Sequence, residues 1–448
     1  MSYKRSMIAG MLAAMAGAAG AQQPTRITFD DAIGLALERN VAVRQATNAV
    51  SLDETAVRQQ RIQRLPDLRL QMSGANNVGR NFSQADGAIV NQQTQSLNTG
   101  LASSFTLFDG GRISAGIRAA ESSQEASTLD LTRARQTAVF TVAQNFVALA
   151  NQREQLRVQE ENLVAQQAQE ALIKQLVDAG SRPVADLYQQ QATVASAKLA
   201  VVQGKRAVEL ANIDLIQALQ LDAAASYDFV TPPPAMPAAA SSESLETLLS
   251  RAIARRVDLD ASEARVAAAE QDIRAARAAR LPTVSLSGSY SSAYSSAADL
   301  AFSTQLDQRR GGALGVGVSI PVFDRGAASL NEQRAKIAAE NARLSLDASR
   351  NAIALEVRRA HLDQATAAEQ LVSAQSQQTS AAMALEMTEA RYRAGAATLV
   401  EVTQARAQQV QAASAVIAAQ YNLLLQRTIM SYYTGDLDPG KTSLLPAS

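Results

Sequence analysis

The chain has 448 residues but no cysteine, no tryptophan and only one histidine. Without cysteine it can form no disulfide bond, no thiolate metal site and no cysteine nucleophile. A single histidine also removes most histidine-based metal sites and acid-base constellations. Lysine and arginine number 42, as do aspartate and glutamate, so the charge balance does not favour nucleic-acid binding. We therefore expect no enzyme, no metal, no cofactor and no nucleic-acid partner.

Glycine and proline are scarce as well, with 22 and 11 residues, roughly half of ordinary usage. So few turn-forming residues predict few, long elements. At the N-terminus, Lys4 and Arg5 precede an uncharged stretch that ends in Ala19-Gly20-Ala21. This is the layout of a secretory signal peptide, which we assign to residues 1–21. No other uncharged apolar run approaches the ~18 residues of a membrane helix, so we expect an exported protein without a helical anchor.

The chain matches itself at an offset of 215 to 216 residues. The matching pairs are Arg64-Leu65-Pro66 with Arg280-Leu281-Pro282, Phe108-Asp109 with Phe323-Asp324, Ala179-Gly180 with Ala394-Gly395, and Asp186-Leu187 with Glu401-Val402. This constant register predicts a tandem duplication. We expect a first structural repeat over residues 22–230, a Pro/Ala/Ser-rich connector over 231–244, a second repeat over 245–436 and a tail over 437–448.

Each repeat is predicted to contain a helix, two strands, a long helix and a shorter helix. The expected helices span 30–64, 113–179 and 184–220 in the first repeat, and 246–280, 327–394 and 399–434 in the second. Apolar residues recur every three, four or seven positions in the long helices, which is typical of heptad packing. The two shorter helices of a repeat together match the length of the long one. We therefore expect them to lie end to end beside it.

Between the first helix and the long helix of each repeat, apolar and small or polar residues alternate with the period of two that is typical of a strand. We expect one strand face to meet lipid. It comprises Leu68, Leu70, Leu101, Phe105, Val284, Leu286, Val316, Val318 and Ile320. A half-buried sheet of a soluble domain fits the alternation equally well. The polar segments 77–96 and 295–312 are expected to be loops. Four strands cannot close a barrel, so a membrane barrel would need several chains.

Taken in order, these features resemble a known family. They are the duplicated unit, the Leu-Pro after each first helix, the strand-to-helix turns 107–112 and 321–326, and the segments 178–187 and 392–402. They resemble the TolC-like outer-membrane efflux proteins, the trimeric export channels of Gram-negative bacteria.

The resemblance implies a mainly α-helical fold with membrane β-strands. In a homotrimer, three chains would form a 12-stranded β-barrel in outer-membrane lipid, continued by an α-helical tunnel through the periplasm. It also implies a passive conduit for efflux or type I secretion, in which a periplasmic adaptor joins the channel to an inner-membrane transporter.

The resemblance also marks the helical tip. Gly180 and Gly395 follow the long helices, where the chain must reverse, and glycine is favoured there because it can take a positive φ. The resemblance implies that they also belong to the surface that contacts the adaptor. Asp186 and Glu401 would lie near the periplasmic entrance, where three copies of each would form acidic rings. They could equally be first-turn carboxylates that stabilise a helix N-terminus.

The best-known gate of the family also uses an arginine and a second aspartate, and here the matching positions hold Ala397 and Gln404. Arg182 aligns with Ala397 through the internal offset. We therefore hypothesise that Arg182 pairs with Asp186 or Glu401, with Tyr392 nearby, and holds the tip closed.

Two other classes of protein share some of these features. A periplasmic adaptor also has a long helical hairpin, but it needs only one, flanked by small β-rich domains. An elongated coiled-coil structural protein would account for the long helices but not for strand pairs that recur at one offset.

Overall fold

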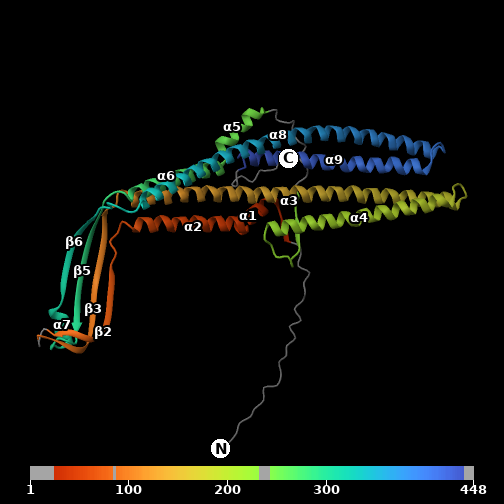
Figure 1. Ribbon diagram of the computed structural model, residues 1–448. Helices are drawn as coiled ribbons and strands as arrows, with labels where there is room; N and C mark the ends of the chain where they lie inside the picture. The colour runs from red at the N-terminus through yellow and green to blue at the C-terminus, as the bar shows by residue number, and fades with distance from the viewer. Residues whose placement is uncertain (1–24, 84–86, 232–242, 438–448) are drawn as a thin grey trace, which may run out of the picture.

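The computed structural model describes residues 25–83, 87–231 and 243–437. The helices lie side by side in a long rod, and a sheet projects steeply from one end of it (Figure 1). The predicted signal peptide lies outside the described residues, as do most of the predicted connector and tail. In the described part of the chain, no helix combines the length and the hydropathy needed to cross a bilayer.

The two repeats present the same order of main elements. The first contains β1 (Thr25–Ile27), α1 (Phe29–Arg39), α2 (Val41–Ile62), β2 (Arg69–Ser83), β3 (Ala88–Phe108), α3 (Arg112–Asp178), α4 (Val184–Ala218) and β4 (Tyr227–Phe229). The second contains α5 (Leu245–Arg255), α6 (Val257–Ala278), β5 (Thr283–Ser295), α7 (Phe302–Gln308), β6 (Gly311–Ser319), α8 (Ala327–Arg393) and α9 (Leu399–Tyr433). Both long helices, α3 and α8, have 67 residues and agree with the prediction to within one residue.

The prediction of a single first helix in each repeat was wrong, because each is interrupted at the same repeated position. Asn40 leaves the helical conformation with ψ 127°, and its side chain accepts hydrogen bonds from the backbone N–H groups of Ala42 and Val43. Arg256 also leaves the helical conformation, with ψ 108°, but its side chain makes no capping hydrogen bond. Neither position holds proline or glycine, so the sequence pattern alone gave no sign of the break.

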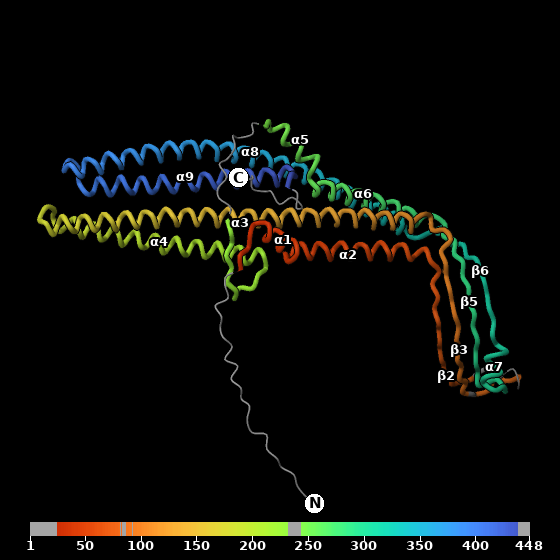
Figure 2. The backbone as a smooth tube through the Cα atoms, turned by 180° about the vertical axis from the view of Figure 1, so that it is seen from behind, coloured from red at the N-terminus to blue at the C-terminus, as the bar shows by residue number. Residues whose placement is uncertain are grey.

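The shorter helices lie end to end along the long ones, as expected. Both views show α2 and α4 following α3, and α6 and α9 following α8 (Figures 1 and 2). The largest apolar core lies midway along the rod, where α1, β1 and β4 pack on α3. There Phe146 makes edge-to-face contacts with Phe29 and Phe229, at 5.3 and 6.0 Å between ring centroids. The rod is therefore braced at its middle.

The four long strands form one antiparallel sheet in the order β2-β3-β5-β6. Residues that pair directly across an antiparallel ladder share a face. Leu70 pairs with Leu101, which pairs with Tyr290, and Phe105 pairs with Leu286, which pairs with Val316. The opposite face is built mainly from Ser, Gly, Ala, Asn and Gln. Leu68 precedes β2 and Ile320 follows β6, so these two lie just outside the strands.

Two segments predicted as loops contain regular secondary structure, and one β-bulge interrupts the alternation along β3. The polar segment 77–96 is mostly strand, because β2 and β3 continue to Ser83 and from Ala88. Segment 295–312 contains α7, whose fully buried Gln305 amide donates to the backbone oxygens of Ser295 and Leu300. A β-bulge at Leu107 places Phe108, not Leu107, opposite Val284. The polar composition of segment 77–96 predicted a loop, but the pairing of β2 with β3 overrides this preference.

Candidate functional site

The far end of the rod is formed by two tight turns, α3 to α4 and α8 to α9. In each turn a glycine takes a left-handed conformation, φ 72° at Gly180 and 74° at Gly395. The next residue, Ser181 or Ala396, donates its backbone N–H to a carbonyl five residues earlier, at 2.8 Å in both turns. This is the Schellman termination that favours glycine. No atom lies within 4 Å of a Cβ built on either glycine, so this surface of the tip is open.

The two turns are joined by an apolar cluster that contains residues of both repeats. It consists of Ile173, Tyr392, Ala397, Leu399 and Val402, with Val177 and Leu187 packed against it. Ala397 is only 8% exposed within this cluster. An arginine at this position would have to bury its charge or displace the cluster. An arginine is instead present at the equivalent position of the other turn.

That cation is Arg182, which lies over the ring of Tyr392. Its guanidinium carbon is 4.5 Å from the ring centroid, and Nη2 donates to the Tyr392 carbonyl oxygen at 3.5 Å. The Tyr392 hydroxyl is buried and has no hydrogen-bond partner among the described residues. Burial raises the pKa of Tyr392, Arg182 opposes that shift, and Asp186 adds to it. Arg182 therefore links the first-repeat turn to the second.

The Glu401 carboxylate is hydrogen-bonded at the start of α9. Its carboxylate accepts hydrogen bonds from the backbone N–H and the hydroxyl of Thr398, at 3.1 and 3.0 Å, in a capping box. These hydrogen bonds, and to a smaller extent Arg391, hold its pKa below the ordinary value. The nearest cation is Arg391, whose Nη2 lies 3.7 Å from the carboxylate.

Asp186 occupies the equivalent position in α4, but its surroundings differ. Pro183 replaces Thr398 at the N-cap and supplies no side-chain hydrogen bond. Within the described residues, the Asp186 carboxylate has no ion pair and no hydrogen bond. Within the described residues of the single chain, Arg182 forms no ion pair with Asp186 or Glu401 and lies on Tyr392 instead. The reason is that the aromatic ring lies between the two turns and takes the guanidinium.

A charged cluster that was not predicted from the sequence lies just above the tip. Glu389 of α8 pairs with Arg406 of α9 and, at 3.7 Å, with Arg393. The spacing of four residues between Glu389 and Arg393 was the only signal in the sequence. Gln404, also on α9, is exposed.

A second missed cluster lies at the middle of the rod, at the break between α5 and α6. Arg256 is 5% exposed and binds Asp258 through two hydrogen bonds, at 3.0 and 2.6 Å, and Glu356 of α8 at 2.5 Å. Burial acts to lower its pKa, but these carboxylates raise it above the ordinary value. Arg133 of α3 lies 3.9 Å from Asp258 and stacks on Tyr432.

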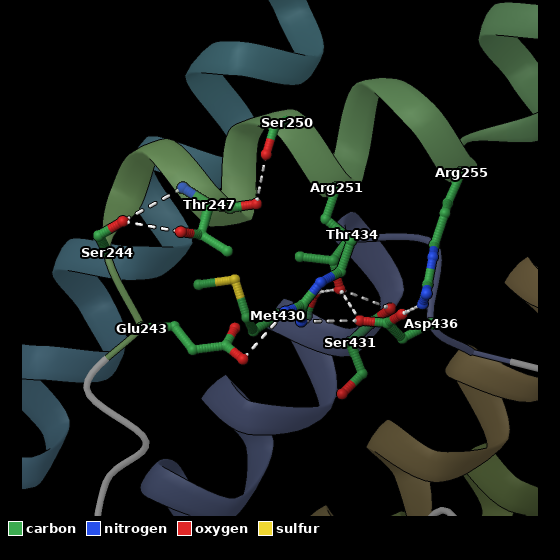
Figure 3. A network of polar contacts seen from close by, with 10 residues as sticks. All are labelled: Glu243, Ser244, Thr247, Ser250, Arg251, Arg255, Met430, Ser431, Thr434 and Asp436. Carbon is green, nitrogen blue, oxygen red and sulfur yellow. Dashed lines mark hydrogen bonds and ion pairs between the residues drawn. The ribbon is translucent and has the colours of Figure 1, made fainter.

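Beside it, the end of α9 is tied to α5 (Figure 3). Asp436 pairs with Arg255 and, at 3.4 Å, with Arg251, which also binds Glu243 at 2.9 Å. Thr434 donates its hydroxyl to Asp436 at 2.9 Å. The second repeat thus joins its start to its end through charged side chains. The first repeat does so through the parallel pairing of β1 with β4.

The family model described as outer membrane efflux protein matches residues 32–220 and 248–435. The chain is 30% identical over 332 residues to the pyoverdine export outer membrane protein OpmQ of Pseudomonas aeruginosa, covering 72% of this chain and 66% of that protein. It is 25% identical over 334 residues to protein CyaE of Bordetella pertussis, covering 74% and 68%. The chain spans about two thirds of the length of these relatives.

Solved structures agree on the fold. The chain superposes on CusC with a TM-score of 0.78 at 23% identity, covering 91% of this chain and 92% of that one. The outer membrane protein VceC of Vibrio cholerae gives 0.77 at 18% identity, covering 91% and 96%. The duplicated rod, the four-stranded sheet with one apolar face and the match over both repeats lead to one assignment. The chain belongs to the outer membrane efflux protein family.

Proposed function

We propose that this chain is the outer-membrane channel of a tripartite export system in a Gram-negative bacterium. In this proposal the channel is a passive conduit that extends into the periplasm, where an adaptor connects it to an inner-membrane transporter. One observation carries the proposal: a sheet with an apolar face continues directly into a helical rod that ends in two open turns. Neither a periplasmic adaptor nor an elongated coiled-coil structural protein combines these parts.

The shape of the single chain supports assembly as a homotrimer. Strands β2 and β6 are the sheet edges, and open edges are not tolerated in lipid. Three copies would supply twelve strands, enough to close a barrel with the apolar face outward. The residues proposed to meet lipid are then Leu68, Leu70, Leu101, Phe105, Val284, Leu286, Val316, Val318 and Ile320.

The tip is the proposed entrance and its closure. We expect Asp186 to dominate the acidic ring, because its carboxylate is unpaired among the described residues, whereas Glu401 is held by Thr398 and Arg391. The open surfaces at Gly180 and Gly395 are the proposed contacts of the adaptor. The Arg182 to Tyr392 stack is the proposed lock, because it joins the two turns that must separate for the entrance to widen.

Planar-bilayer recording of the purified protein tests this function. We expect discrete, cation-selective openings. Asp186→Asn should reduce the selectivity for cations, and Glu401→Gln should reduce it less, because that carboxylate is partly neutralised by Arg391. Arg182→Ala should raise the conductance.

Lys198→Ala, at an exposed position of α4 with no ion pair among the described residues, serves as the control for removing a cation. Folded protein without openings would contradict the channel. An unchanged conductance in Arg182→Ala, together with normal openings in the wild type, would contradict only the lock.

A further inference from the structure

The same arginine motif ends the helix before each pair of strands. Residues 58–66 have the sequence RQQRIQRLP and residues 274–282 have RAARAARLP. Each motif places three arginines three residues apart, two in the C-terminal part of α2 or α6 and one just after the helix, where the rod meets the sheet (Figure 1). They are Arg58, Arg61 and Arg64 in the first repeat and Arg274, Arg277 and Arg280 in the second. All six residues are exposed.

The start of α8 and the turn before it add to this charge. Arg325, Arg334 and Lys336 are exposed there. The three stretches 58–67, 274–280 and 321–336 thus contain three cationic residues each. They contain only three carboxylates in total, although acidic and basic residues are equal in number over the whole chain. We name these nine cationic residues the cationic collar.

The three carboxylates are used within the fold. Asp67 accepts hydrogen bonds from the backbone N–H and hydroxyl of Ser104, at 2.6 and 3.0 Å. Asp324 accepts from the backbone N–H groups of Gly326 and Ala328, at 2.9 and 2.7 Å, and so caps α8.

The third carboxylate, Glu332, is buried and pairs with Lys336 at 2.9 Å, Arg280 at 2.8 Å and Arg277 at 3.4 Å. Outside these stretches, Arg61 pairs with Glu121 of α3 at 2.6 Å. The three stretches therefore contain nine cationic side chains and three carboxylates, of which Glu332 is buried, so this junction carries an excess of positive charge.

The collar directly adjoins the apolar face of the sheet. Leu70, Val284 and Val318 lie at the strand ends next to the junction. In the turn between β6 and α8, Val322 is 93% and Phe323 is 85% exposed. Such a succession of exposed apolar side chains and then cations is what a membrane-water boundary requires. In an outer-membrane protein with a periplasmic rod, this boundary is the periplasmic leaflet.

We propose that the cationic collar binds the headgroups of anionic phospholipids in the periplasmic leaflet and so fixes the depth at which the channel is inserted. Arginine suits this role because its guanidinium can bind a phosphate through two parallel hydrogen bonds. A favourable interaction with the helix dipole does not account for the motif, since that effect is confined to the last turn. Arg58 and Arg274 lie on the N-terminal side of the last four residues of α2 and α6, and so outside the last turn.

The test measures lipid binding to the intact, detergent-solubilised protein by native mass spectrometry. Dioleoyl phosphatidylglycerol is the anionic probe and dioleoyl phosphatidylethanolamine the zwitterionic one. The collar variant is Arg58→Gln/Arg274→Gln/Arg325→Gln, which breaks no ion pair of the described residues. The control is Arg206→Gln/Arg358→Gln/Arg359→Gln, which removes three exposed arginines from α4 and α8, also without ion pairs in the described part of the chain.

We expect the wild type and the control to prefer phosphatidylglycerol. We expect the collar variant to bind it at least about tenfold more weakly, since each cation near an anionic membrane surface contributes roughly fivefold in affinity. Equal binding of phosphatidylglycerol by collar variant and control would overturn the proposal. Displacement of phosphatidylglycerol by inorganic phosphate at equal concentration would overturn it too, because the collar would then bind free anions.

Bilayer recording separates this inference from the channel function. The collar variant should conduct with unchanged ion selectivity. A shift in selectivity without loss of lipid binding would overturn the proposal, because the arginines would then line the conduit.

Discussion

The ends of the long helices require a residue with positive φ, which favours glycine. The helices α3, α4, α8 and α9 all end with a backbone hydrogen bond to the carbonyl five residues earlier, donated by Ser181, Leu221, Ala396 and Asp436. The residue before each donor has positive φ, and in three cases it is glycine. The exception is Gln220, with φ 52°, which aligns with Gly435 in the second repeat. A side chain in this conformation is strained.

Gln220→Gly should therefore stabilise the protein by about 0.5 to 1 kcal/mol. Glycine removes the strain, and the greater backbone entropy of the unfolded chain offsets part of this gain. The thermal midpoint of the purified protein, measured at a fixed scan rate, would rise. A fall would contradict the assignment of strain to Gln220.

The glycines at the other helix ends differ in their surroundings, which gives a matched comparison. A Cβ on Gly435 would meet the Arg255 carbonyl oxygen at 2.8 Å, whereas one on Gly395 would meet nothing within 4 Å. Both have left-handed φ, so alanine strains both equally. Gly435→Ala should lower the thermal midpoint more than Gly395→Ala. Equal shifts would show that the contact with Arg255 relaxes without cost.

The capping box at Glu401 predicts a pH dependence. Hydrogen bonds from Thr398 lower the pKa of Glu401 from its ordinary 4.5 in the folded protein. Its contribution to stability is therefore complete above pH 4.5 and is lost as the pH falls through the lower folded pKa. The difference in thermal midpoint between wild type and Glu401→Ala should shrink as the pH drops below that value. A constant difference down to about pH 3 would contradict the capping role.

At the level of single residues, the sequence predicted positions better than partners. The internal offset correctly placed Asp186 and Glu401 in the first turns of equivalent helices. It could not show that Thr398 makes a capping box and Pro183 does not, nor that Arg182 would lie on Tyr392. Those contacts depend on how the two turns pack across the apolar cluster, which brings together residues 210 apart in the chain.

Among the elements, the breaks at Asn40 and Arg256 show two ways to interrupt a helix. Asn40 is a good N-cap whose side chain accepts from the next helical turn. Arg256 has no such side-chain bond and is held out of the helical conformation by Asp258 and Glu356. The first break is thus local, and the second depends on the packing of α6 against α8.

Replacing Arg256 should accordingly cost more than replacing Asn40. We expect Arg256→Ala to destabilise by about 2 kcal/mol or more, since it leaves Glu356 without its cation and Asp258 with only the more distant Arg133. Asn40→Ala should cost about 1 kcal/mol, the usual value for a lost N-cap. Adding Glu356→Gln to Arg256→Ala should restore part of the loss. If the carboxylates left by Arg256→Ala are not the cause of its instability, the double variant will be no more stable than Arg256→Ala.

On the scale of the whole molecule, α8 has two apolar faces, and the single chain covers only one. Ala339, Leu346 and Ile353 are buried against the rest of the chain. Leu330, Ile337 and Leu344, seven residues apart on the opposite side, are each more than half exposed. A helix that is apolar on both sides needs a second partner. A neighbouring copy in the proposed trimer would supply one.

Ile337→Glu/Leu344→Glu should therefore prevent trimer formation, because two charges would have to be buried in the interface. Size-exclusion chromatography with light scattering in detergent would show the monomer. Ala338→Glu/Ser345→Glu adds the same charge to exposed positions about a quarter-turn away and should leave the trimer intact. Trimers of equal stability from both variants would place the subunit interface elsewhere.

The sequence by itself determined the duplication, the lengths of α3, α4, α8 and α9, and the strand faces. All of these follow from local chemistry: heptad spacing, the period of two along a strand, and glycine or proline where helices must end. Only the tertiary structure decided the break at Arg256 and the stack of Arg182 on Tyr392. Each of these depends on a partner far away in the chain, and no local pattern encodes which distant side chain will arrive there.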